Sequence, residues 1–260
     1  MSFLYVKVLL VLLFLVSNKT FSQLEVLEND EELYYEVSYS FINIGWVKFT
    51  TKKKDGSPDV YICNAVMKSN DALPFITVNY EFTSELITKD NNIFPVYFTS
   101  KEFKGNQTSI LTYDFNYDSS FVNLKKIGFN NEIEYEKKMP LHSVYQDGLS
   151  IFYYARFNSF KNGSRNVPVL IHQDSSSLNI NFNTAKKEIE IDEVDYPLSS
   201  VYVDGMSYFS AVFGLTGEFS GWFSNDKARI PLKSKLRVKI GNVTLELKDW
   251  KRKNWSPPKY

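Results

Sequence analysis

The chain has 260 residues, of which 43% are hydrophobic, 23% charged and 16% aromatic. Disordered, collagen-like and coiled-coil proteins each need a biased composition that is absent here, so these classes are excluded. The 30 basic and 30 acidic residues cancel. Nucleic-acid-binding domains need a strong basic excess for their phosphate contacts, so no nucleic-acid partner is expected.

The first 22 residues have the pattern of a cleaved signal peptide. Lys7 supplies a positive charge, an unbroken apolar run follows at 8–16, and small residues at −3 and −1 predict cleavage after Ser22. The run is shorter than the roughly 20 apolar residues of a membrane-spanning helix, although an uncleaved anchor is the alternative. Removal of Lys7 and Lys19 leaves 28 basic and 30 acidic residues. We therefore expect a periplasmic or secreted protein with no transmembrane segment after signal removal.

Few residues of the chain are suited to metal binding or nucleophilic catalysis. A single cysteine, Cys63, excludes an intrachain disulfide and a multi-thiolate metal site, and we expect it to fill the core. The two histidines, His142 and His172, are far apart and lack metal-ligand spacing, so both are interpreted as ordinary polar residues. No cofactor and no metal are expected.

Alternation of apolar and polar residues with period two dominates from Glu32 onward and predicts antiparallel strands. The apolar face of the first strand is predicted to run from Tyr35 to Phe41, and turn dipeptides such as Asp55-Gly56 separate the later strands. In chain order, further strands are expected at 46–50, 60–67, 75–88, 96–104, 109–113, 121–127, 132–137, 167–172, 178–183, 188–193, around 201–203, and at 218–224, 229–235, 236–240 and 243–247.

One segment, 143–157, breaks this rhythm with apolar residues at helical spacing. Ser143 and Gln146 form a capping-box pattern, in which each side chain satisfies a backbone N–H of the first turn. The helix is apolar on nearly all sides, so we expect it to be buried against a sheet.

These elements predict a mainly β fold: an antiparallel meander that curls into a barrel, half-barrel or sandwich, with one principal buried helix. A single domain is expected over 23–250. The basic, aromatic and proline-bearing tail over 251–260 is expected to be loose.

Three segments carry a resemblance to a known family. Residues 33–37 and 44–47 read Leu-Tyr-Tyr-Glu-Val and Ile-Gly-Trp-Val, residues 147–156 read Asp-Gly-Leu-Ser-Ile-Phe-Tyr-Tyr-Ala-Arg, and Trp-Phe-Ser-Asn-Asp at 222–226 precedes Arg-Ile-Pro-Leu at 229–232. In this order they resemble the DUF3108 family of exported bacterial proteins, over roughly residues 30–250. The leader ending in Phe-Ser-Gln is similar to those of Bacteroidetes exported proteins. The family's function is not established, so the resemblance implies no catalytic residues.

The family-motif positions are interpreted as structural. Trp222 would anchor a pair of strands joined by a polar turn, and Pro231 would lie at a sheet edge or a bulge. Arg156, near the end of the helix, would bind terminal carbonyl groups and favour the negative end of the helix dipole. The motif residues are Gly45, Asp147, Ser150, Tyr154, Arg156, Trp222, Ser224, Asp226, Arg229 and Pro231.

Two sets of residues have the types needed for catalysis but not the required context. Ser150, His142 and Asp147 have the composition of a catalytic triad, yet no Gly-x-Ser-x-Gly elbow exposes the serine. The carboxylates Glu132, Glu134 and Glu136 share one strand face, as glycosidase carboxylates face a substrate, but a solvated strand face has the same pattern. We therefore expect no enzymatic activity.

The aromatic content, 17 Tyr and 21 Phe, exceeds what a minimal core needs. A curved sheet around a buried helix makes a concave apolar surface, and such surfaces commonly bind lipids or other amphiphiles. The leading hypothesis is a non-catalytic binding or carrier module of the cell envelope for an amphiphile, either a lipid or a glycan-lipid. The alternative is a structural or assembly factor, filled by its own side chains, that contacts an envelope protein through an edge strand or the basic tail.

Overall fold

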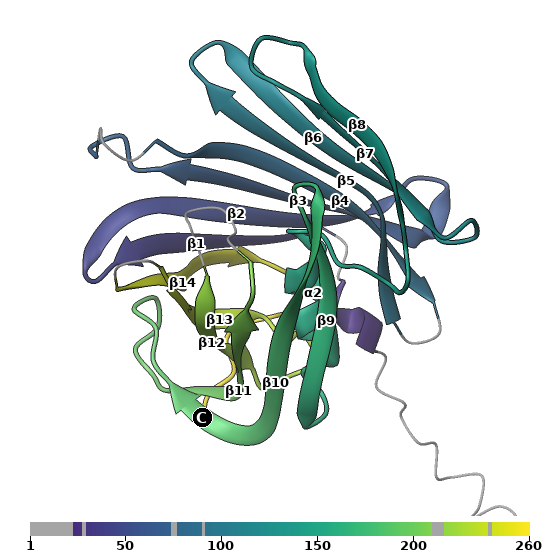
Figure 1. Ribbon diagram of the computed structural model, residues 1–260. Coiled ribbons are helices and arrows are strands. Elements are labelled where there is room, and N and C mark those ends of the chain that lie inside the picture. Colours follow the sequence, from purple (N-terminus) through teal and green to yellow (C-terminus); the bar gives the residue numbers. More distant parts are fainter. Residues whose placement is uncertain (1–22, 28–29, 74–76, 90–91, 210–215, 239–240) are drawn as a thin grey trace, which may run out of the picture.

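A single antiparallel sheet of 14 strands dominates the computed structural model (Figure 1). The structure describes residues 23–260 except 28–29, 74–76, 90–91, 210–215 and 239–240. The predicted signal peptide, 1–22, lies outside the described residues. In chain order the elements are η1 (Gln23–Val26), β1 (Glu31–Tyr39), β2 (Ile42–Lys54), β3 (Ser57–Ser69), β4 (Asn79–Lys89), β5 (Asn92–Lys104), β6 (Gln107–Asn116), β7 (Phe121–Ile127), β8 (Ile133–Pro140), α2 (Ser150–Asn158), β9 (Gly163–Ile171), β10 (Asp174–Ile189), β11 (Leu198–Ser207), β12 (Gly217–Ser224), β13 (Pro231–Arg237) and β14 (Asn242–Lys251).

The strands form a meander in which the first strand, β1, pairs with the last strand, β14. Strands β1 to β8 follow one another as neighbours, β9 to β14 do the same, and β14 pairs with β1. The two edges of the sheet are therefore β8 and β9, which are consecutive in the chain. The sheet curves strongly in Figure 1, but no ladder joins β8 to β9 within the described residues. The predicted mainly β meander is confirmed, as a barrel-like sheet that does not close.

The chain between the two edge strands carries α2, which lies between the halves of the curved sheet (Figure 1). Its buried side chains include Tyr153, Arg156 and Phe157, which confirms the predicted buried helix. No helix of the described residues is long and apolar enough to cross a membrane.

The helix begins at Ser150, later than predicted, because the segment before it pairs with the sheet. The backbone N–H of Gln146 donates to the carbonyl of Pro168, and the N–H of Leu170 donates to the carbonyl of Gln146, at 2.9 and 2.8 Å. These two bonds hold Gln146 in a parallel bridge to β9. The predicted capping box of Ser143 and Gln146 is therefore wrong.

Several predicted strand boundaries are also wrong. The predicted strand 178–183 and the first two residues of the predicted strand 188–193 lie in the single strand β10, whose pairing with β11 is irregular between Asn183 and Lys187. Residues 190–193 follow the end of β10 and are not in a strand. Likewise, β13 covers parts of the two predicted strands 229–235 and 236–240. The predicted strand at 75–88 starts at Asn79, and residues 74–76 lie outside the described residues.

The first strand is also shorter than predicted. It ends at Tyr39, because Ser40 adopts a left-handed conformation that starts the turn to β2. Phe41 lies in that turn with 94% of its surface exposed, so it does not share the buried face of Tyr35 and Val37.

The tail is docked on the sheet, so the prediction of a loose tail is wrong. The N–H of Ser199 donates to the carbonyl of Pro258 at 2.8 Å, and the N–H of Tyr260 donates to the carbonyl of Pro197 at 2.9 Å. The indole N–H of Trp255 donates to Asp226 Oδ2 at 2.7 Å. Proline has no backbone N–H to donate, so a proline-bearing tail is easily taken for a loose one. The proline carbonyls can still accept hydrogen bonds, and here those of Pro197 and Pro258 do so.

A buried ion pair joins α2 to β1. Both terminal nitrogens of Arg156 donate to the Glu31 carboxylate, at 2.7 and 3.0 Å, and the two side chains are 0% and 1% exposed. Arg156 Nη2 also donates to the carbonyl of Ala228 at 3.0 Å, and Arg252 from the tail pairs with the same carboxylate. The position of Arg156 near the helix end had predicted bonds to the terminal carbonyls of the helix. Its guanidinium instead bonds to Glu31 and to the Ala228 carbonyl, so that prediction is wrong.

We expect Arg156→Met to lower the free energy of unfolding by about 3 kcal/mol, because it removes one partner of a buried carboxylate. The matched control is Arg237→Met in the Arg237–Glu218 pair, whose side chains are 62% and 68% exposed. This change should alter stability by less than about 1 kcal/mol. Urea denaturation of both variants measures the difference, and equal losses would show that the buried pair has no special role.

Candidate functional site

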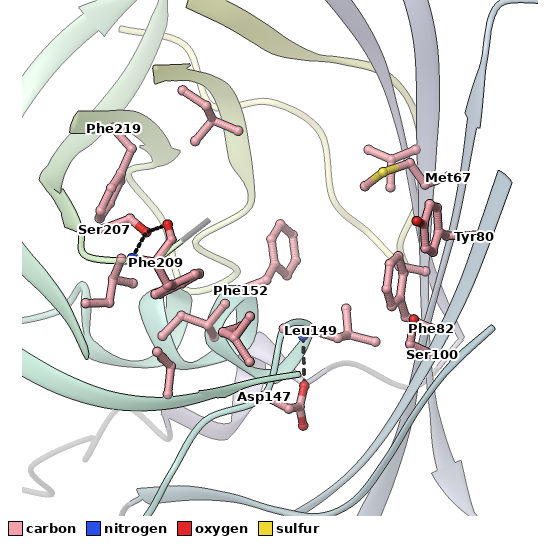
Figure 2. A pocket seen from close by; sticks show the side chains of 18 of the residues that line it. Met67, Tyr80, Phe82, Ser100, Asp147, Leu149, Phe152, Ser207, Phe209 and Phe219 are labelled. Carbon is pink, nitrogen blue, oxygen red and sulfur yellow. Dashed lines mark hydrogen bonds between the residues drawn. The ribbon is translucent and has the colours of Figure 1, made fainter. Parts of the chain in front are cut away.

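A cavity of about 620 Å³ lies between the two halves of the sheet, beside α2 (Figure 2). Its lining is mainly aromatic and aliphatic, with a few hydroxyl and charged groups. Side chains from β3, β4 and β5 form one wall, the start of α2 forms a second, and residues around β11 and β12 form a third (Figure 2). The labelled lining residues are Met67, Tyr80, Phe82, Ser100, Asp147, Leu149, Phe152, Ser207, Phe209 and Phe219.

Aromatic rings form a continuous surface across one wall. Tyr80, Phe82, Phe98 and Tyr113 make successive ring contacts, with centroids 5.6, 6.3 and 5.1 Å apart. These rings come from three neighbouring strands, because inward positions recur at every second residue of a strand. From the helix, Phe152 stacks on Phe49 with centroids 4.2 Å apart.

The cavity separates two clusters of buried apolar side chains. The larger cluster belongs mainly to β1–β8, α2 and β14, and it includes Tyr153 and Phe157. The smaller belongs to β9–β12, and Ile151 and Ala155 from another side of α2 pack against it. The same helix therefore contributes to both clusters and lines the space between them.

Four charged side chains of the lining, those of Glu102, Lys126, Glu218 and Arg237, are partly or fully exposed. Tyr80 lies directly across from Glu102 in the sheet, and burial together with this carboxylate raises the pKa of Tyr80, so its hydroxyl stays protonated at neutral pH. Lys126 pairs with Glu134 at 2.8 Å, and both side chains are partly exposed. On another wall, Glu218 and Arg237 form the exposed pair described above. The lining thus combines apolar side chains with ionic side chains that are partly or fully exposed.

Asp147 is the one fully buried carboxylate of the lining, and it caps α2. Its Oδ1 accepts the N–H groups of Leu149 and Ser150, both at 2.7 Å, and its Oδ2 accepts the Ser84 hydroxyl from β4 at 2.7 Å. Burial raises the pKa of Asp147 to about 6. Because both oxygens are bonded in the cap, Asp147 is positioned to hold the helix and not to exchange a proton with a ligand.

The three residues with the composition of a catalytic triad are not assembled into one. Ser150 contacts Asp147, since its Oγ accepts the N–H of Asp147 at 2.7 Å. His142 is exposed, and it is not among the hydrogen-bond partners of Asp147 and Ser150 in the described part of the chain. His172 lies in the β9–β10 turn at the cavity, where its carbonyl accepts the Tyr113 hydroxyl at 2.8 Å.

The three glutamates of β8 and the turn before it are exposed. Glu134 and Glu136 pair with Lys126 and Lys125, whereas Glu132 contacts Asn130. Their arrangement is that of a solvated strand face, and Ile133, which lies between Glu132 and Glu134, is itself exposed. Among the residues that the structure describes, no group of three or more His, Cys, Asp or Glu side chains is arranged for a metal ion.

The loop from β12 to β13 is held by motif residues. Asp226 Oδ1 accepts the Ser224 hydroxyl at 2.8 Å and the N–H groups of Ala228 and Arg229 at 2.9 and 3.2 Å. Arg229 has a positive φ of 48°, and its guanidinium donates to the Ser224 carbonyl and lies over the Phe160 ring. These contacts fix the loop beside the end of α2.

The three motif segments meet in the structure. Arg156 joins the second to the third through the Ala228 carbonyl, and the Tyr35 hydroxyl joins the first to the third by donating to the Pro231 carbonyl at 2.8 Å. Of the ten motif residues, only Asp147 and Pro231 line the cavity.

The remaining motif residues serve packing. Gly45 lies so close to β3 that a Cβ would come within 2.3 Å of the Lys68 carbonyl oxygen. Trp222 is partly exposed on the outer face beside Tyr202, and Tyr154 packs against the smaller cluster.

Sequence reasoning did not identify Glu31 or Arg252 as important, although the signal exists. Glu31, Leu33 and Tyr35 are alternate residues on one buried face of β1. A carboxylate at such a position needs a buried cationic partner. The pattern therefore indicates that a partner exists, but not which arginine supplies it.

The raised pKa of Asp147 predicts a pH-dependent stability. An unfolded aspartate has a pKa of about 3.9, so the folded state binds more protons between that value and about pH 6. The contribution of Asp147 to the free energy of unfolding is therefore largest below pH 4, and it is lost as the pH rises through 6. Relative to Asp147→Asn, which keeps an oxygen to cap Leu149 and Ser150, the wild type should lose on the order of 2–3 kcal/mol between pH 4 and 7.

Chemical denaturation at each pH measures this difference. The exposed β2–β3 turn supplies Asp55→Asn as a control for the loss of one negative charge. If the difference between wild type and Asp147→Asn does not change with pH, the raised pKa is refuted.

Comparison with known proteins places the chain among uncharacterised domains. A family model described as "Protein of unknown function (DUF3108)" matches residues 34–248. A search of the curated proteins finds no match. One solved structure that the chain resembles is the beta-barrel-like protein of domain of unknown function DUF1849 from Brucella abortus, with a TM-score of 0.55 and 8% identity. That alignment covers 87% of this chain and 99% of the other, and it shows a shared fold alone.

Proposed function

This chain belongs to the DUF3108 family, and we propose that it is a non-catalytic protein of the cell envelope that binds or carries an amphiphile in its central cavity. The amphiphile would be a lipid or a glycan-lipid. The observation that carries this proposal is the aromatic-lined space of about 620 Å³ between the halves of the sheet. This volume lies within the range of roughly 300–1,000 Å³ that is usual for small-molecule sites.

Packing physics supports a ligand in this space. Protein interiors are close-packed and contain few voids larger than a water molecule. Side chains such as Phe82, Phe152 and Phe219 offer water few hydrogen-bond partners, so ordered water would be held weakly there. Each Å² of apolar surface removed from water contributes about 25 cal/mol, which favours an apolar chain as the occupant.

The placement of charge supports an amphiphile over a purely apolar ligand. Glu102, Lys126 and the Glu218–Arg237 pair are partly or fully exposed, whereas aromatic residues of the lining such as Phe98 and Tyr113 are buried. An apolar chain would fill the interior while a polar head remains among groups that can bind it. The signal-peptide pattern of residues 1–22 supports a location in the envelope.

The role of an assembly factor is less well supported. That alternative expects an interior filled by its own side chains, whereas the cavity is large. It also relies on a free tail or a free edge, but the tail is docked on the sheet. The edge strand β8 carries Glu134, Glu136, Lys137 and Lys138, and such charges protect an edge from pairing with another chain.

The proposal predicts that the protein binds a single-chain amphiphilic probe in the cavity. Titration with 11-(dansylamino)undecanoic acid should give a saturable rise and blue shift of dansyl fluorescence. Ala155 lines the cavity from α2, so Ala155→Trp should fill part of the space and weaken binding at least tenfold. Phe152→Ala should also weaken binding, because it removes the ring that stacks on Phe49.

The matched control is Phe41→Ala, which removes an aromatic ring that lies outside the cavity and is almost fully exposed. It should bind the probe like the wild type, and thermal unfolding should show that all variants are folded. Full binding by a folded Ala155→Trp variant would place the probe elsewhere and refute the cavity as the site.

A further inference from the structure

A second hollow, of about 530 Å³, lies on the outer face of the sheet over β10–β13 and the start of β14. In β11 the side chains of Val201 and Val203 belong to the buried cluster, so the alternating residues Tyr202 and Asp204 face outwards. These two side chains therefore point to the opposite side of the sheet from the central cavity, and Glu218, Phe219 and Ser220 of β12 line both hollows. We call the second hollow the outer groove.

A row of polar residues crosses the outer groove from strand to strand. Asn181 pairs with Asp204, Asp204 with Ser220, and Ser220 with Lys235 in the registers of four adjacent strands. The four side chains therefore form one line across the face, at right angles to the strands. Together they offer amide, carboxylate, hydroxyl and ammonium groups along a single path.

Hydrogen bonds orient this row and leave capacity for a ligand. The Ser164 hydroxyl donates to Asn181 Oδ1 at 2.6 Å, and Asn181 Nδ2 donates to Asp204 Oδ1 at 2.7 Å. Within the described residues, Asp204 Oδ2 and the side-chain amide of Asn179 have no hydrogen-bond partner, and both residues line the groove. Asn181 and Asp204 are thus held in place, and the row retains unused acceptors and donors.

Aromatic side chains border the polar row. Tyr202 lines the groove and packs edge-on against Trp222, with ring centroids 5.3 Å apart. Tyr208, at another part of the groove, is 65% exposed. A partly exposed ring, Tyr202, and an exposed ring, Tyr208, beside fixed amide and carboxylate groups match a ligand with both C–H faces and many hydroxyl groups.

From this arrangement we propose that the outer groove binds a neutral oligosaccharide. Sugar hydroxyls would donate to Asp204 and accept from Asn179 and Lys235, while a pyranose face would pack against Tyr202. The carboxylates of Asp204 and Glu218 in the same groove disfavour an acidic glycan or a nucleic acid. The predominantly polar lining disfavours an apolar chain. The residues that would bind the sugar, Asn179, Tyr202, Asp204 and Lys235, do not line the central cavity, so this proposal stands or falls independently of the proposed carrier function.

A printed array of neutral and acidic glycans, probed with the fluorescently labelled protein, tests the proposal. Neutral oligosaccharides should be retained, and calorimetric titration with the best-retained soluble glycan should give a saturable isotherm. Asp204→Ala and Tyr202→Ala should each lower the affinity at least tenfold, because each removes one half of the recognition chemistry.

The chain offers a matched control on the other half of the sheet. Tyr34 stacks with Trp46 on the outer face of β1 and β2, with ring centroids 5.6 Å apart, and lies outside the outer groove. Tyr34→Ala should bind glycans like the wild type, and thermal melting should show that all variants are folded. Retention of no neutral glycan, retention of acidic glycans alone, or an equal loss in Tyr34→Ala would each overturn the proposal.

Discussion

The Glu31 carboxylate lies where four parts of the chain converge, and its pairing with Arg156 fixes the arrangement of the rest. The pair joins β1 to α2, the Ala228 carbonyl adds the β12–β13 loop, and Arg252 adds the tail. A carboxylate removed from water is costly unless it is paired and hydrogen-bonded. Any arrangement that separates these four parts leaves the buried Glu31 carboxylate without its partners and is therefore unfavourable. The pair thus favours one packing of the chain over the alternatives.

The helix is held at both ends, and this explains why a cavity persists between the two clusters. At its start, Asp147 bonds to Ser84 on β4, and near its end Arg156 bonds to Glu31 and the Ala228 carbonyl. The helix is thereby anchored to the strands of one half and to a loop of the other. Since the sheet has no ladder between β8 and β9 in the described residues, the anchored helix sets the separation of its two halves.

The sequence was sufficient for the fold class because the alternation of apolar and polar residues is local information. Strands such as β7 match their predicted bounds, and Cys63 is buried in the core as expected. The start of α2 could not be predicted, because Gln146 is drawn into a bridge with β9, a contact between distant segments. The docking of the tail depends on the carbonyls of Pro197 and Pro258, whose partners no local pattern specifies.

For the site, the sequence predicted an aromatic concave surface but not its walls. The alternation places Phe82 and Phe98 on the inner face, which is enough to expect a concave apolar surface. Which rings then pack together and which border the cavity depends on where α2 is anchored. The outer groove was not predicted, because its polar row arises only from the registers of four strands.

The central claim is that the cavity carries an amphiphile, and a native mass spectrum of the protein tests it most directly. The protein would be purified without detergent from a bacterial periplasm, and the spectrum recorded before and after denaturation. We expect an additional mass that is lost on denaturation and recovered by organic extraction. A well-folded protein with only the mass of its own chain, which also takes up no added palmitate or phospholipid, would contradict the account.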